Sequence, residues 1–205
     1  MTLSKSKALF FLVGFVLGGL LMYMLLATFS TSSTSPTISE ELSWQTSAGP
    51  RLGLPLPRLP VSVGASAVVD VKNSEWKLRK LDSSEVSFSE FAGKVIFLNL
   101  WGTWCEPCVW EMPHLQALYD SLKGEPIAFL TVADEPLATL RVFATKEALT
   151  MPMYQSVSKK PPGFDIEARP ATLILNKTGN VVLSEVGAAR WSDQSVIKLI
   201  RNLYK

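Results

Sequence analysis

The chain has only two cysteines, and they lie where a predicted buried strand gives way to a predicted helix. Cys105 and Cys108 enclose Glu106 and Pro107. The preceding run, 94–101, is mostly apolar, as expected for a strand covered on both faces. Two thiols at such a junction can close a small disulfide ring, and the first lies at the helix N-terminus, which favours its anion. This layout predicts a dithiol redox centre.

Near the N-terminus, residues 8–27 form a run without a charged side chain. A helix of about 20 residues spans roughly 30 Å, enough to cross the core of a bilayer. Lys5 and Lys7 precede the run and Glu40 is the first charge after it, so we expect residues 1–7 in the cytoplasm and the remainder outside. A cleaved signal peptide is the alternative. The run is longer than a usual signal-peptide core, and no clear Ala-x-Ala site follows it.

Beyond the apolar run, the composition separates a tether from a domain. Residues 28–60 are rich in Ser, Thr and Pro, which predicts an extended tether, although the stretch after Pro50 is compatible with packing on the domain. Residues 61–205 have globular patterning. The formal net charge of +2 gives no argument for binding nucleic acid. An exported protein with one close cysteine pair has no structural disulfide framework, so its cysteines are interpreted as reactive.

Within the domain, hydrophobic periodicity predicts alternating strands and helices. The expected strands are 67–71, 76–81, 95–100, 127–132, 171–175 and 181–186; the expected helices are 106–123, 137–149 and 192–203, the last with Ser192 as N-cap. In 137–149, Leu140, Val142, Phe143 and Ala144 are expected to face the core. The order predicts an α/β fold with a mixed sheet and helices on both faces.

Several motifs agree with one another. Asn99-Leu-Trp-Gly-Thr-Trp-Cys-Glu-Pro-Cys108 is followed by Glu111-Met-Pro113, and Arg169-Pro170 leads the expected strand 171–175. Together they resemble the thioredoxin fold, and within it the membrane-anchored TlpA/ResA-like thiol–disulfide oxidoreductases. The resemblance implies a central mixed β-sheet flanked by helices, here after an N-terminal transmembrane helix. It also implies a redox-active Cys105–Cys108 disulfide with no other cofactor.

The two cysteines are expected to divide the chemistry between them. Cys105 attacks a substrate disulfide as a thiolate, and Cys108 resolves the mixed disulfide. Glu111 lies one helical turn after Cys108 and is expected to accept its proton, a role that the resemblance supports. The alternative is a surface glutamate that only favours the helix N-terminus. A zinc site is not expected, because two cysteines and one histidine fall short of the usual four ligands.

Three residues are expected to tune the potential: Glu106, Pro107 and Asn99. The charge of Glu106 beside Cys105 opposes thiolate formation and would make the pair more reducing. An ordinary exposed residue at the helix start is the alternative for Glu106. Asn99 stands where cytoplasmic thioredoxins have a buried Asp, and Glu106-Pro107 replaces their Gly-Pro, as in ResA-like proteins.

On the substrate side, the resemblance implies a cis Pro170 packed against the cysteines, with backbone that receives substrate as an added strand. Arg169 is expected to stabilise the Cys105 thiolate or to select acidic partners. Trp104, together with Trp101, is expected to pack around the site and contribute to substrate binding. His114 is expected at the surface, because helical spacing turns it away from Cys105. The remaining tryptophans considered, Trp76, Trp110 and Trp191, are expected in the core or in surface grooves.

The resemblance implies a single-pass protein of the bacterial cytoplasmic membrane, anchored in the lipid bilayer by 8–27, with its catalytic domain on the extracytoplasmic side. It implies reduction of disulfides in exported proteins, with apocytochrome c as the best-known substrate and a CcdA/DsbD-type membrane protein as electron donor. Alternatives are a disulfide oxidase or isomerase, or a non-catalytic thioredoxin-like binding module. A peroxidase is disfavoured by the lack of a Thr-x-x-Cys site before the helix.

Overall fold

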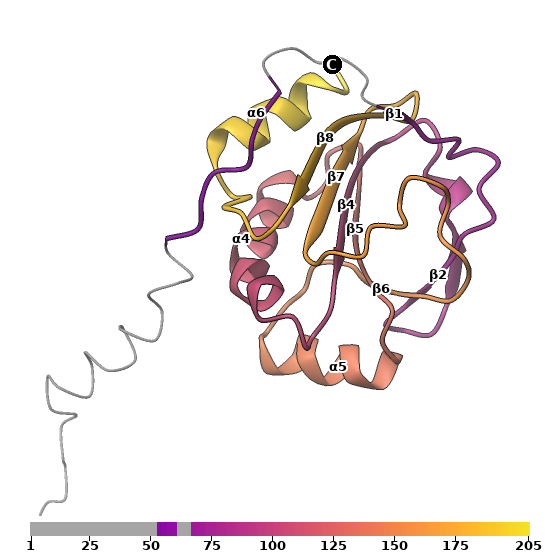
Figure 1. Ribbon diagram of the computed structural model, residues 1–205, viewed down its shortest axis with the longest axis vertical. Coiled ribbons are helices and arrows are strands. Elements are labelled where there is room, and N and C mark those ends of the chain that lie inside the picture. The colour runs from indigo at the N-terminus through magenta and orange to yellow at the C-terminus, as the bar shows by residue number, and fades with distance from the viewer. Residues whose placement is uncertain (1–52, 61–66) are drawn as a thin grey trace, which may run out of the picture. The chain divides into compact units, whose positions relative to one another are not determined.

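The computed structural model describes residues 53–60 and 67–205 (Figure 1), and the predicted segments 1–7 and 8–27 lie outside these ranges. The described residues form an eight-stranded sheet in the order β1-β8-β7-β4-β5-β6-β2-β3. The strands are β1 Ala67–Val68, β2 Lys77–Lys80, β3 Glu85–Ser87, β4 Val95–Trp101, β5 Ile127–Ala133, β6 Met153–Ser156, β7 Ala171–Leu175 and β8 Asn180–Val186. The helices are η1 Phe88–Phe91, α4 Glu106–Leu122, α5 Leu137–Lys146 and α6 Gln194–Asn202. None of these helices is long and apolar enough to cross a membrane.

Strand β4 lies at the centre of the sheet and ends at the cysteine motif. It pairs parallel with β5 and antiparallel with β7, and all of its residues are buried. A continuous apolar run is what a strand covered on both faces requires. The predicted mixed sheet and the predicted central strand are therefore confirmed.

The α-helices of the described chain all pack on one face of the sheet, so the expectation of helices on both faces is wrong. Buried side chains of α4, α5 and α6 belong to one core cluster with Phe97 and Trp101 of β4. The reason is topological. The connections β4–α4–β5 and β5–α5–β6 advance across the sheet in the same direction, and right-handed crossovers then place both helices on the same face.

The other face is covered by an aromatic cluster instead of an α-helix. Trp76, Phe88 of η1 and Phe164 of the β6–β7 loop have ring centroids 5.2–5.8 Å apart. They pack with the side chains of β4 that alternate with Phe97, namely Ile96, Leu98 and Leu100.

Some local expectations also differ from the structure. Strands β3 and β6 were not predicted. Helix α6 uses Asp193 as its N-cap instead of Ser192, since the Asp193 carboxylate accepts from the Ser195 amide at 2.9 Å. Val142 on α5 is 70% exposed instead of facing the core, whereas Leu140 and Ala144 are buried.

Residues 53–60, called here the N-terminal strap, pack on the domain; they belong to the predicted tether 28–60, within the stretch after Pro50 for which the sequence left such packing open. Leu54 and Pro57 are buried. The Arg190 amide donates to the Pro55 carbonyl at 2.8 Å, and the Arg58 amide donates to Glu185 Oε2 at 2.9 Å. The packed unit therefore extends N-terminally beyond the predicted boundary at 61.

Candidate active site

The two cysteines are joined in a disulfide at the start of α4. The Cα atoms of Cys105 and Cys108 are 5.2 Å apart, and Cys105 is the N-cap residue, whose Sγ accepts from the Cys108 amide at 3.3 Å. Pro107 lies in the first turn, where its missing amide hydrogen costs no helical bond. In the reduced state, the same amide and the helix N-terminus would favour a Cys105 thiolate.

Glu111 is a buried carboxylate one turn after Cys108, with no exposed surface. Its Oε1 accepts from Asn99 Nδ2 at 2.8 Å. Its Oε2 accepts from the Ala189 amide at 3.1 Å and from Trp191 Nε1 at 2.8 Å. Burial raises the pKa of Glu111 to about 7, although these three hydrogen bonds act in the opposite direction. A carboxyl group with such a pKa can both accept and release a proton near neutral pH.

Asn99 connects this carboxylate to the centre of the sheet. Its Nδ2 also donates to Thr172 Oγ1 of β7 at 2.9 Å, so one amide links β4, α4 and β7. Asn99 Oδ1 is buried and has no hydrogen-bond partner among the described residues. The side chain predicted to tune the cysteines is therefore bonded to Glu111, the predicted proton acceptor.

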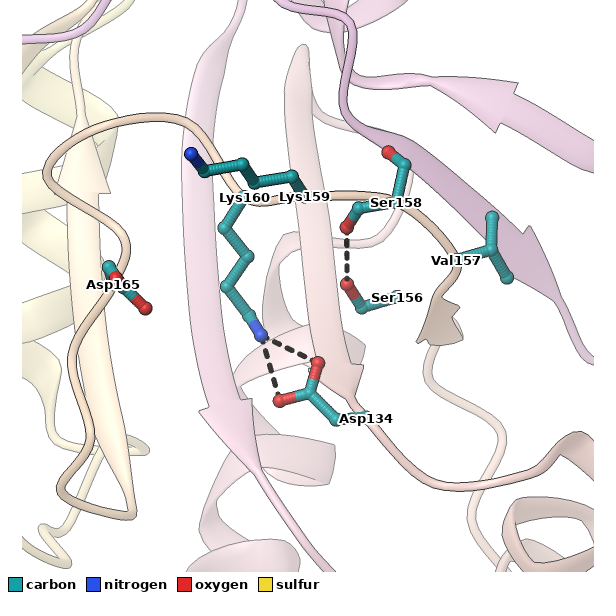
Figure 2. A pocket seen from close by; sticks show the side chains of 7 residues that line it. All are labelled: Asp134, Ser156, Val157, Ser158, Lys159, Lys160 and Asp165. Carbon is teal, nitrogen blue, oxygen red and sulfur yellow. Dashed lines mark hydrogen bonds and ion pairs between the residues drawn. The ribbon is translucent and has the colours of Figure 1, made fainter.

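The Arg169–Pro170 peptide bond is cis, as the resemblance implied, and Pro170 is buried. The Gly187 amide donates to the Pro170 carbonyl at 2.9 Å, which fixes this residue against the end of β8. The loop that leads to Pro170 is held by a second contact, an ion pair. Lys160 Nζ lies 2.6 and 2.8 Å from the carboxylate oxygens of Asp134, at a polar pocket beside the end of β5 (Figure 2).

The guanidinium group of Arg169 bonds to the same carboxylate. It lies 3.5 Å from Asp134 Oδ2 and also donates to the carbonyls of Ile166 and Ala168. Its side chain is only 11% exposed. None of these contacts is to Cys105, so the described geometry gives no support for direct stabilisation of the thiolate by Arg169.

Comparison with known proteins identifies the family. A model of the AhpC/TSA family matches residues 69–184, more than half of the chain. The chain belongs to the AhpC/TSA family.

Thiol-disulfide oxidoreductase ResA of Halalkalibacterium halodurans is 32% identical over 112 residues, 54% of this chain and 64% of that protein. ResA of Geobacillus kaustophilus is 32% identical over 123 residues, 59% of this chain and 67% of that protein. The chain thus spans about two thirds of these relatives' lengths.

Solved structures similar to this AhpC/TSA-family chain show the thioredoxin-like fold. A thiol:disulfide interchange protein of the thioredoxin family from Chlorobium tepidum superposes with a TM-score of 0.52 and 17% identity, over 67% of this chain and 99% of that one. A DsbF homologue from Corynebacterium diphtheriae gives 0.52 and 22%, over 73% and 99%. The predicted resemblance is confirmed by the family match and by the ResA relatives.

Other predicted site residues have mixed outcomes in this AhpC/TSA-family chain. Trp104, expected to pack around the site, is 71% exposed, whereas Trp101 is 1% exposed and buried. Glu106 and Pro107 are exposed at the helix start. His114 is half-buried, and its Nδ1 lies 2.9 Å from Ser192 Oγ.

The sequence reasoning missed two carboxylates that follow β5 and hold loops at this end of the sheet. Glu135 accepts from the amide and the hydroxyl of Thr103, both at 2.6 Å, and so holds the loop that leads to Cys105. Asp134 binds the loop of Arg169. Both follow β5, which runs parallel to β4, and the carboxyl ends of adjacent parallel strands meet at one edge of a sheet. That rule could have found them.

Trp191 was also missed as a partner of Glu111. The indole reaches the carboxylate from the segment after β8, far from Glu111 in sequence. No local motif marks this contact, so only the folded structure identifies it.

Proposed function

We propose that the chain is a membrane-tethered thiol–disulfide oxidoreductase that reduces disulfides of exported proteins through Cys105 and Cys108. One observation carries the proposal: a cysteine pair at the N-terminus of α4 has, one turn further along the helix, a buried carboxyl group whose pKa is raised to about 7. A thiolate site next to an internal proton acceptor supplies both requirements of disulfide exchange.

The proposed cycle starts from the reduced pair. The Cys105 thiolate attacks one sulfur of the substrate disulfide, the substrate S–S bond breaks, and the other substrate sulfur leaves as a thiolate that takes up a proton. Cys108 then passes its proton to Glu111 and attacks Cys105 Sγ. The enzyme disulfide forms, and the bond between Cys105 and the substrate breaks. The second substrate sulfur leaves as a thiolate and is protonated, so the substrate gains two electrons from the enzyme and two protons. The Cys108 proton, held on Glu111 and then released, accounts for one of these protons, and solvent supplies the other because Cys105 reacts as a thiolate.

The cellular setting is part of the same proposal. Residues 8–27 would cross the bacterial cytoplasmic membrane once, with residues 1–7 in the cytoplasm. Residues 28–52 would act as the tether between the membrane and the packed domain. The domain would then work outside the cytoplasm, with electrons from a CcdA/DsbD-type membrane donor. Apocytochrome c is the proposed substrate, on the resemblance to ResA-like proteins.

The first test is the reduction potential of the Cys105–Cys108 pair, measured by equilibrating the full chain in detergent with thiol redox buffers. A value near or below the thioredoxin level of about −270 mV is expected for a reductase. A value near about −120 mV, that of a strong oxidant, would contradict the proposal and favour disulfide formation.

Two cysteine variants test the division of labour, and each is the control for the other. Cys108→Ser should react once with a disulfide-containing peptide and accumulate the mixed disulfide, because the resolving thiol is missing. Cys105→Ser should form no adduct through position 105 and should lose turnover. A Cys105→Ser protein with full activity in cells would instead support a non-catalytic binding module.

A further inference from the structure

Trp191 is a buried indole that bonds to the proposed proton acceptor. It has no exposed surface, and its ring packs edge-on against Phe97 at a centroid distance of 5.5 Å. Its Nε1 donates to Glu111 Oε2 at 2.8 Å. Because the ring is held in the core, the direction of this N–H is fixed.

The donors around Glu111 distinguish its two oxygens. Oε2 accepts from both Trp191 and the Ala189 amide, whereas Oε1 accepts, among the described residues, only from Asn99. Oε1 is therefore the oxygen with more lone-pair capacity left to receive a proton. The three donors come from β4 and from the segment between β8 and α6, so the carboxylate is fixed from more than one side.

The described groups that bond to Glu111 carry no formal charge: burial raises its pKa, and the hydrogen bonds from Trp191, Ala189 and Asn99 oppose that rise. Titratable or charged groups nevertheless lie on each neighbouring element. They are Cys105, Cys108 and His114 of α4, Glu185 of β8 with its partner Arg58 of the strap, and Arg190 with its partner Asp193 before α6. To assign a change in pH dependence to Glu111, it must therefore be compared with the pH dependence of a variant that lacks the Glu111 carboxyl group.

We propose that Trp191 is a positioning residue for the reaction, whose indole N–H orients the Glu111 carboxylate and stabilises it as the anion that accepts the Cys108 proton at Oε1. This inference rests on the proposed function. It gives a role in the proton transfer to the segment between β8 and α6, which lies outside the Cys105–Cys108 motif and the Arg169–Pro170 motif.

Trp76 provides a matched control on the opposite face of the sheet. It is also buried, at 1% exposure, and its Nε1 also donates one hydrogen bond, to Ser156 Oγ at 2.9 Å. Its partner is the neutral hydroxyl of a partly buried residue at the end of β6. Trp191→Phe and Trp76→Phe therefore each remove one buried indole N–H, but only the first changes the surroundings of Glu111.

The experiment is single-turnover reduction of a disulfide-containing peptide by the prereduced full chain in detergent. The reaction is run at a series of pH values between 5 and 9, and samples are then quenched with acid. The mixed disulfide and the enzyme disulfide are quantified by mass spectrometry. In Trp191→Phe, the loss of a donor to a carboxylate is expected to move the rise of the resolving rate up by about one pH unit, which slows it roughly tenfold below pH 7. Mixed disulfide should accumulate there. Trp76→Phe should keep the parent profile.

Glu111→Gln separates this inference from the proposed function. If Glu111→Gln slows resolution and Trp191→Phe adds nothing in that background, the two residues act as one unit and the inference stands. If Glu111→Gln slows resolution but Trp191→Phe alone keeps the parent profile, the inference is wrong and the proposed function survives. If Glu111→Gln has no effect, the role of Glu111 as proton acceptor fails, and the inference fails with it.

Two further outcomes are informative. An equal shift in Trp76→Phe would mean general loosening of the core and would overturn the inference. If Trp191→Phe does not fold, replacement of Trp191 by its sulfur analogue 3-benzothienylalanine removes the N–H and keeps the ring shape. The same shift in pH profile is then expected, and an unchanged profile would contradict the proposal.

Discussion

The two faces of the central sheet are built from the same strands but bury different chemistry. On the face covered by the α-helices, Thr131, Asn99 and Thr172 lie side by side across β5, β4 and β7 and are buried, with Glu111 above them. On the opposite face, the alternate residues of β4 are Ile96, Leu98 and Leu100, packed under aromatic rings. Because side chains of a strand alternate between faces, one sequence supplies both environments.

The difference shows that burial by itself does not mark a functional residue. Trp76 and Trp191 are equally buried, and each donates one hydrogen bond. The partner of Trp76 is a hydroxyl, which costs little to bury once bonded, whereas the partner of Trp191 is an ionisable carboxyl group. What distinguishes the helix-covered face is an ionisable group placed one helical turn after Cys108.

The largest expected effect on stability lies on the apolar face. Phe88→Ala should lower the free energy of unfolding by about 3–5 kcal/mol, because it leaves a cavity among Trp76, Phe91 and Phe164. Denaturant unfolding of the oxidised full chain in detergent at several pH values would measure this loss. The loss should be the same at pH 5 and pH 8, and a strong pH dependence would break the contrast between the two faces.

A smaller effect on stability, but one that depends on pH, is expected for the helix-covered face. Burial raises the pKa of Glu111 from 4.5 to about 7, so the folded state holds the proton more tightly than the unfolded chain. The resulting stabilisation is complete below pH 4.5 and is lost as the pH rises through 7, a change of about 3 kcal/mol. Glu111→Gln should remove this dependence. Parallel stability curves of the parent and the variant between pH 4.5 and 8 would contradict the assignment.

The ion pair of the N-terminal strap should contribute less to the free energy of unfolding. Glu185 is 9% exposed and accepts from the amide and guanidinium of Arg58, but the Arg58 side chain is 88% exposed. Arg58→Ala should therefore lower the free energy of unfolding by only about 1 kcal/mol or less. The loss should be larger at low salt than at high salt, because salt screens the ion pair in the parent. Arg79→Ala, which removes an exposed ion pair with Glu85 on β3, is the control. A loss of several kcal/mol in Arg58→Ala alone would mean that the strap is an integral part of the helix-covered face.

The smallest effect is expected at the polar edge between the two faces. Asp134→Asn removes the carboxylate charge that binds Lys160 and Arg169, but Asp134 is half-exposed, so the loss should stay below about 1 kcal/mol. We expect KM for a disulfide-containing peptide to rise up to about fivefold at unchanged kcat, because the loop of Pro170 loses a constraint. Glu147→Gln, in an exposed pair with Lys146 on α5, is the control. A fall in kcat in Asp134→Asn would indicate a role closer to the chemistry.

Much of the fold could be predicted because it depends on local patterns. The apolar run of β4, the helical spacing of α4 and the hairpin of β7 and β8 are each specified by adjacent residues, and their predicted bounds lie close to those of the structure. Strands β3 and β6 are three and four residues long. Segments this short carry too little periodicity to predict, and they become strands because neighbouring strands pair with them: β2 pairs with both, and β5 also pairs with β6.

The site divides in the same way. Cys105, Cys108 and Glu111 could be predicted because they follow one another at a spacing of three residues, so that each lies about one helical turn from the next. The engagement of Arg169 by Asp134 and the exposure of Trp104 could not, since both depend on how a loop lies over the end of the sheet.

The sequence by itself determined the class of the chain, its cysteine pair and the carboxyl group next to it, because these follow from residue types at short spacings. Only the tertiary structure decided that the α-helices share one face, that the strap belongs to the domain and that Trp191 reaches Glu111. Each of these depends on contacts between segments far apart in the chain. Their geometry is fixed by the direction of the crossovers and the packing of the core, which no local pattern contains.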